Sequence, residues 1–117
     1  TLNSYSYALC EQGTDLEKAR QMSSNANQLV TNNGEYQKTY GLILFKLEDY
    51  KAAERWFKKA LDNGQKENPM TLERYGDTLY KLDKVDEAVE YWQKAQSKGS
   101  QSSILNKKIT DRKLYEQ

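Results

Sequence analysis

The sequence predicts an all-α protein, a stack of helical hairpins. One spaced pattern of small residues occurs three times, at intervals of 34 and then 35 residues, and a period of this length is typical of helical repeats. Apolar residues within each copy also recur at the spacing of one helix face. The copies are Ala19, Ser23 and Ala26; Ala53, Phe57 and Ala60; and Ala88, Trp92 and Ala95.

The length of the chain limits how many domains it can form, and its charge limits which classes of partner are expected. The 117 residues suit a single domain over residues 1–117. With 18 basic and 17 acidic side chains the net charge is +1, which gives no electrostatic reason to expect a nucleic acid or a membrane surface as partner. No apolar run approaches the roughly 20 residues that a membrane-spanning helix needs, so we expect no direct membrane insertion.

Turn signals divide each repeat into two helices. Asn68 before Pro69 predicts a helix start, because asparagine caps helices and proline is tolerated at the first helical position. Asn33-Gly34 marks the same point in the preceding repeat, and Asn63-Gly64 a helix stop. The expected units are about 1–32, 33–67 and 68–97.

The first unit is less regular than the other two. From Ser6 to Ala19 is 13 residues, whereas the corresponding interval in each later unit is 12. We therefore expect one extra residue in the first turn, at positions 12–15, where surface loops accept insertions. Thr14 and Glu17 have the spacing of a capping box, which predicts that Thr14 caps the second helix.

Packing explains the recurring residue types. Ser6, Gly41 and Gly76 are expected where the two helices of a hairpin cross closely, with Ala53 and Ala88 on the opposing helix. Phe57 and Trp92 supply the large buried side chains.

The C-terminal segment, about 101–117, predicts a capping helix, because helical stacks need a terminal element with one polar face. Ser102 and Ser103 are candidate caps, and Ile104, Leu105 and Ile109 its apolar side. Its basic residues are interpreted as a solvated face, with an anion-binding patch as the alternative: Lys107, Lys108, Arg112 and Lys113.

These features resemble the tetratricopeptide repeat (TPR) family over about residues 1–97. The match is strongest over residues 34–96, although Gln37 and Ser23 depart from the family pattern. The resemblance implies a right-handed α-solenoid of about three hairpins plus the capping helix. The run from Tyr5 to Ala19 also resembles bacterial TPR arrays, some of them periplasmic or attached to a membrane by an upstream lipid anchor. The compartment stays open, the cytoplasm included. The residues that carry the match are Tyr40, Gly41, Tyr50, Ala53, Phe57, Ala60, Leu61, Leu72, Tyr75, Gly76, Ala88, Trp92 and Ala95.

The resemblance implies a non-catalytic scaffold that binds a protein or peptide partner in a groove lined by the first helix of each unit. An exposed apolar strip with basic edges would suit a peptide with hydrophobic anchors and some acidic character. One ligand class of the family, a chaperone's acidic C-terminal peptide, is not expected here. Of the residues at that clamp's positions, Asn3, Tyr7, Thr39, Met70 and Arg74, only Arg74 suits it. The groove residues expected in this chain are Tyr7, Lys38, Leu42, Phe45, Lys46, Arg74, Asp77, Tyr80 and Lys81.

Catalysis is not expected. The chain has no histidine, the commonest general base and metal ligand, and Cys10 therefore lacks the partner that would activate it. We expect no catalytic residue, no metal site and no cofactor.

Two alternative functions stay open. The helix-like start of the sequence, with Leu2, Tyr5 and Leu9, predicts an uncapped face that further upstream repeats, a second copy of the chain or another partner would cover. The interval of 35 residues is also that of the RNA-binding pentatricopeptide repeat, although the near-neutral charge argues against RNA.

Overall fold

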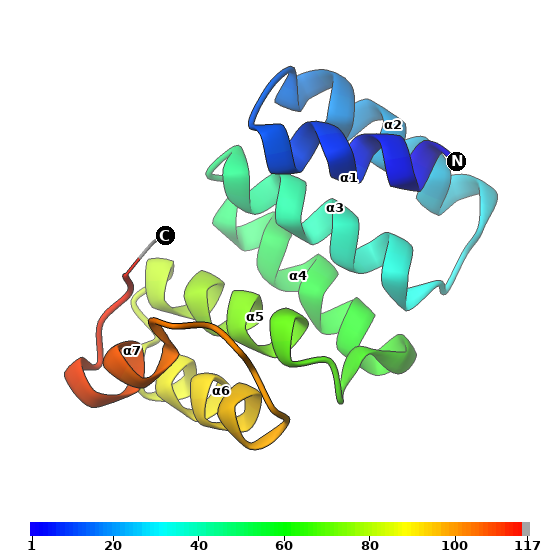
Figure 1. Ribbon diagram of the computed structural model, residues 1–117. Helices are drawn as coiled ribbons and strands as arrows, with labels where there is room; N and C mark the ends of the chain where they lie inside the picture. The colour runs from blue at the N-terminus through cyan, green and yellow to red at the C-terminus, as the bar shows by residue number, and fades with distance from the viewer. Residues whose placement is uncertain (116–117) are drawn as a thin grey trace. The chain divides into compact units, whose positions relative to one another are not determined.

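The computed structural model describes residues 1–115, and in that range the chain forms seven α-helices and no strand (Figure 1). The prediction of an all-α helical repeat is confirmed. The chain divides into two compact units: residues 1–65, with α1 to α4, and the part from Lys66 onward, with α5 to α7. The helices are α1 (Leu2–Gln12), α2 (Leu16–Leu29), α3 (Gly34–Lys46), α4 (Tyr50–Ala60), α5 (Pro69–Lys81), α6 (Val85–Ser97) and α7 (Leu105–Asp111), and a π-type turn, η1 (Leu61–Gln65), follows α4.

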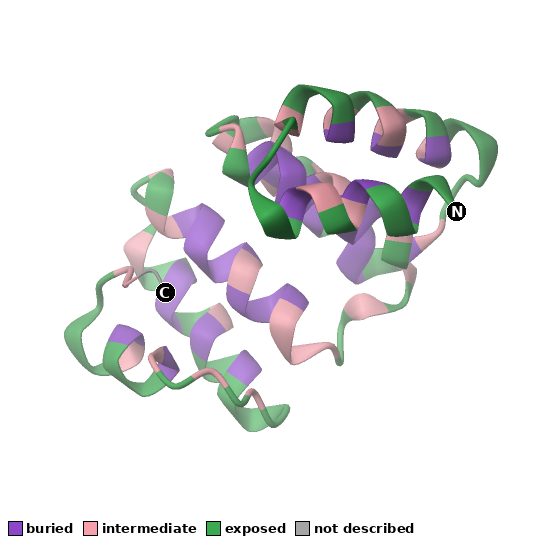
Figure 2. Cartoon of the chain, turned by 45° about the horizontal axis from the view of Figure 1, so that its top comes forward, coloured by how far each residue is buried: buried purple, intermediate pink, exposed green. Residues whose placement is uncertain are grey.

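Helix α3 is the centre of the first unit. It packs against α1, α2 and α4, and nine of its 13 residues are buried. By contrast, α1 and α2 bury three residues each, along the side that faces their neighbours (Figure 2). Because α3 has neighbours on several sides, most of its residues are buried.

Two glycines bring paired helices close together. A Cβ on Gly41 would lie 3.0 Å from the Phe57 ring of the facing helix, and a Cβ on Gly76 would lie 2.6 Å from Trp92 Cδ1. Both aromatic side chains are completely buried. The predicted crossing of small residues is therefore confirmed for α3–α4 and α5–α6.

The first pair replaces this arrangement with two serines. Ser6 and Ser23 are both completely buried. The Ser6 hydroxyl donates to the Asn3 carbonyl at 2.9 Å, whereas Ser23 Oγ has no hydrogen-bond partner among the described residues. The α1–α2 pair therefore holds a buried hydroxyl at the position where α4 and α6 carry an aromatic ring.

The extra residue of the first turn is Asp15. In the first turn the Thr14 amide donates to the Leu9 carbonyl. The same hydrogen bond closes the other two turns, where the amides of Asp49 and Lys84 donate to the carbonyls of Leu44 and Leu79. Asp49 and Lys84 are themselves the N-caps of α4 and α6, whereas α2 begins one residue later, after Asp15 at φ 49°. The predicted capping box is wrong, because the Thr14 hydroxyl donates to Gln12 Oε1 instead.

The asparagine caps are confirmed. The Asn33 side chain accepts from the Tyr36 amide, and the Asn68 side chain accepts from the amides of Met70 and Thr71. Pro69 occupies the first helical position of α5, where no intrahelical donor is needed.

The terminal helix is shorter than predicted. Helix α7 spans only Leu105–Asp111 and is followed by Arg112 in the left-handed region, at φ 52°. Ser102 and Ser103 do not cap it, since its N-cap is Ile104, which makes no side-chain cap hydrogen bond. Residues 116 and 117 of the predicted helix lie outside the described residues. None of the helices within residues 1–115 has both the length and the apolar character to cross a membrane.

Candidate functional site

Helices α1 and α3 bring two of the predicted groove residues together. Lys38 Nζ lies 5.7 Å from the centroid of the Tyr7 ring, a cation–π contact between the two helices. The same ammonium donates to Glu35 Oε1 at 2.6 Å. Lys38 is buried, whereas Tyr7 is half-buried and Glu35 is exposed. The three side chains form a polar cluster whose solvent-exposed part consists of Tyr7 and Glu35.

Burial and nearby charge keep the Tyr7 phenol protonated. Its pKa is raised above the usual value, first by burial and then by the carboxylates of Glu11 and Glu35. The Tyr7 phenol is hydrogen-bonded to Glu11, and the Lys38 ammonium can donate further hydrogen bonds. The cluster therefore favours a ligand group that accepts hydrogen bonds, such as a carboxylate or a peptide carbonyl.

Two groove residues predicted to be exposed are not. Leu42 is 6% exposed and Phe45 is 9% exposed. Phe45 packs edge-on against Tyr50, with ring centroids 5.3 Å apart. The predicted apolar strip is wrong at these positions, because α3 is the central helix of its unit. Lys46, at the end of α3, is exposed as predicted.

The predicted groove residues of α5 divide in the same way. Tyr80 is half-buried, with its ring 6.0 Å from that of Trp92, and Lys81 is exposed. The Arg74 side chain is 40% exposed and its Nη1 lies 3.5 Å from Asp77 Oδ2. Asp77 is only 1% exposed. Asp77 is therefore buried, and both of its carboxylate oxygens have partners within the second unit.

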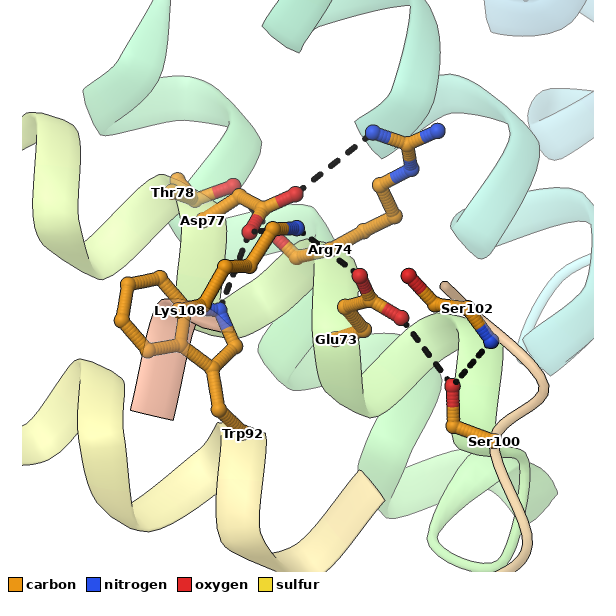
Figure 3. A network of polar contacts seen from close by, with 8 residues as sticks. All are labelled: Glu73, Arg74, Asp77, Thr78, Trp92, Ser100, Ser102 and Lys108. Carbon is orange, nitrogen blue, oxygen red and sulfur yellow. Dashed lines mark hydrogen bonds and ion pairs between the residues drawn. The ribbon is translucent and has the colours of Figure 1, made fainter. Parts of the chain in front are cut away.

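The partners of Asp77 come from three helices of the second unit (Figure 3). The Lys108 ammonium of α7 donates to Asp77 Oδ1 at 2.9 Å and to Glu73 Oε2 at 2.8 Å. The indole N–H of Trp92, on α6, donates to the same oxygen of Asp77 at 2.9 Å. Burial raises the pKa of Asp77 above its usual range, although the charges of Lys108 and Arg74 oppose the rise.

Comparisons with known proteins agree on the architecture. Residues 39–63 match the family model described as "Tetratricopeptide repeat". The chain has the TPR fold. No curated protein sequence matches the chain.

Solved TPR domains superimpose on most of the chain at low identity. The first TPR of Spaghetti (RPAP3), bound to the HSP90 peptide SRMEEVD, has a TM-score of 0.85 and 14% identity, covering 95% of this chain and 86% of that one. The second TPR domain of human RPAP3, in complex with the HSP70 peptide SGPTIEEVD, has a TM-score of 0.83 and 14% identity, with 98% and 94% covered. The N-terminal domain of stress-induced protein-1 from C. elegans gives 0.70 and 18%, with 96% and 97% covered.

Sequence reasoning missed the role of Lys108. The sequence predicts that Lys108 lies on a solvated face, but the residue is only 2% exposed. Within residues 1–115 it is the only α7 lysine whose ammonium pairs with Glu73 and Asp77. A signal was present, since Glu73 and Asp77 are four residues apart and so share one face of their helix.

No metal-binding group emerges elsewhere in the part of the chain that the structure describes. Within residues 1–115 no three side chains among cysteine, aspartate and glutamate gather as metal ligands would. Cys10 is a buried thiol on α1. The bacterial character of the repeats stays a prediction.

Proposed function

We propose that the chain is a non-catalytic protein-interaction module whose α1–α3 face binds a segment of a partner protein. The observation that carries this proposal is the convergence of Tyr7 and Lys38 from two helices, with 5.7 Å between the ammonium and the ring centroid. An aromatic ring beside a cation is a common anchor at protein interfaces. Two of the solved TPR domains that superimpose on the chain are bound to peptides.

The chemistry of this face favours an acidic segment. Lys38 Nζ is paired with Glu35, whose side chain is 53% exposed. A ligand carboxylate could therefore replace Glu35, because the displaced Glu35 side chain is already largely in solvent. Lys46 lies on the same helix, about 12 Å further along its axis. A ligand with two suitably spaced acidic groups would engage both ammonium groups.

The proposed ligand differs from the chaperone peptides of the structural neighbours. At two of the clamp positions the chain has Asn3 and Thr39, and both are buried. Thr39 also donates its hydroxyl to the Glu35 carbonyl at 3.1 Å. These side chains offer no positive charge for a terminal carboxylate, so we expect SRMEEVD and SGPTIEEVD to bind weakly.

A peptide array tests the proposal. The probes are immobilised short peptides rich in glutamate and leucine, and matched peptides in which every glutamate is replaced by glutamine. We expect the full chain to retain the acidic set, and a Tyr7→Ala, Lys38→Met double variant to bind about tenfold more weakly.

The control variant is Lys58→Met, which removes an exposed lysine from α4. It should bind as the wild type does. Equal retention of the glutamate and glutamine peptides, or unchanged binding by the double variant, would contradict the proposed site.

Self-association is a second candidate, favoured by one observation. All four large hydrophobic residues exposed within residues 1–115 belong to the first helix pair and the turn after it: Leu2, Tyr5, Leu29 and Val30. Such a cluster favours contact with another protein surface. Sedimentation at several concentrations tests whether a second copy covers it. A Leu29→Glu variant should then shift the chain toward monomer, and a wild type that stays monomeric throughout would exclude this function.

A further inference from the structure

Helix α7 is held against the second unit chiefly by one buried ammonium. Lys108 is 2% exposed and donates to carboxylates on two successive turns of α5. Its Nζ also lies 5.9 Å from the centroid of the Trp92 ring. Figure 3 shows this side chain between Asp77, Glu73 and the indole. The Lys108 side chain is therefore buried among side chains of α5 and α6.

Residues outside α7 also contact the carboxylates of Glu73 and Asp77. Glu73 Oε1 accepts from the Ser100 hydroxyl at 3.1 Å, and that hydroxyl accepts in turn from the Ser102 amide at 3.2 Å. On the other side Arg74 approaches Asp77 Oδ2, and the Trp92 indole N–H orients Oδ1. These contacts hold both carboxylates in place, and each has one oxygen directed at the ammonium.

The remaining hold on α7 is slight. The helix has seven residues and no side-chain cap at its start, and helices this short are not stable alone in water. Leu105 is its only buried apolar residue among those described. The surface pairs Arg112–Asp86 and Asn106–Gln96 are exposed, and such pairs add little.

We propose that α7 is a removable lid, and that the face it covers on α5 and α6 binds a lysine-bearing helix of a partner protein. Removing α7 leaves Glu73 and Asp77 without their ammonium partner, and a buried carboxylate without a counter-charge is strongly unfavourable. A segment that takes the place of α7 is therefore favoured if it brings a cation. A partner segment with a lysine in the position of Lys108 meets this condition.

The residues of α7 that are buried indicate which side chains a partner helix would need. Leu105 and Lys108 are three residues apart and both are buried, so they lie on one face of the helix. The neighbouring Lys107 is exposed. We expect the partner to present a leucine-like side chain and, three residues later, a lysine.

This inference does not depend on the proposed function. The acidic-peptide face lies on α1 and α3, in the first unit, whereas the lysine site lies wholly on helices of the second unit. Binding at the lysine site is read from Trp92, on α6, whereas binding at the acidic-peptide face is read from retention on the peptide array. The experiments can therefore show that one of the two proposals is wrong while the other holds.

The test uses the full chain with Lys108→Met and a synthetic peptide of residues 100–115. The indole N–H resonance of Trp92 reports binding, because this group donates to Asp77. We expect the peptide to bind the variant about tenfold more tightly than the wild type, in which α7 competes. A peptide with methionine at position 108 should bind the variant about tenfold more weakly. The Trp56 resonance should not move.

Two further chains complete the experiment. Lys107→Met, which removes the exposed neighbour, should behave as the wild type does. A Glu73→Gln, Asp77→Asn, Lys108→Met chain should keep its helical circular dichroism and bind neither peptide. Equal affinity for the lysine and methionine peptides, or no shift of Trp92 in a folded Lys108→Met chain, would overturn the proposal. If Lys108→Met loses its helical signal, the wild-type chain with excess lysine peptide replaces it. There an unmoved Trp92 resonance overturns the proposal equally.

Discussion

A methyl group on Gly76 would lie 2.6 Å from Cδ1 and 2.7 Å from Nε1 of Trp92. The same methyl would lie 3.1 Å from the Ala88 carbonyl oxygen, which is backbone and cannot swing aside. The indole is also tethered, since its N–H donates to Asp77. Close packing of α5 on α6 therefore depends on the absence of a side chain at position 76.

Gly76→Ala should accordingly destabilise the chain. We expect a loss of about 1–3 kcal/mol in the free energy of unfolding, the usual cost of an overpacked core. Gly41→Ala should cost less, because its new methyl would meet the Phe57 ring at 3.0 Å and no backbone atom within that distance. Urea unfolding of the two variants measures the difference. An equal loss in both would show that the indole tether is unimportant.

Ser23→Ala should stabilise the first unit. The buried Ser23 hydroxyl lacks a partner among the described residues, and an unsatisfied buried polar group costs about 1–3 kcal/mol. Ser24→Ala is the matched control, because it brings the same gain in helix propensity at a half-buried position next in the helix. Thermal unfolding should rank Ser23→Ala above Ser24→Ala. The reverse order would mean that the hydroxyl is solvated.

Asp77→Asn should change how stability depends on pH. Burial raises the pKa of Asp77 in the folded chain, so between the unfolded and folded pKa values the folded chain binds more protons than the unfolded one. The contribution of Asp77 to stability is therefore greatest in acid and declines as the pH rises through that window. Subtracting the urea-unfolding curve of Asp77→Asn from that of the wild type isolates this decline. A difference that grows more favourable with pH would show that Lys108 outweighs burial.

Asn68→Ala should weaken the start of α5. The Asn68 side chain caps two backbone amides, those of Met70 and Thr71, and loss of such a cap costs about 1 kcal/mol. Asn25→Ala, at an exposed position inside α2, removes an asparagine without removing a cap and should not destabilise. Chemical denaturation of both variants checks the contrast.

The helix pairs could be predicted from the sequence because their signals are local. The repeated small residues and the Asn68-Pro69 start depend on neighbours a few positions away, and the structure confirms them. The exposure of Phe45 was mispredicted, because it depends on how many helices surround α3 and not on the pattern within α3. Lys108 was missed for a related reason. Its partner Glu73 is 35 residues distant, so no pattern within α7 itself indicates that Lys108 has a buried acidic partner.

The serines of the first pair have a consequence for exchanging repeats. Ser6 and Ser23 suit each other because both are small, whereas Gly41 accommodates Phe57 and Gly76 accommodates Trp92. Grafting α6 opposite α1 would press an indole onto the Ser6 side chain, and grafting α2 opposite α5 would leave the room above Gly76 unfilled. The helices of this chain are interchangeable only as matched pairs, so a shortened or lengthened array should be cut between pairs and never within one.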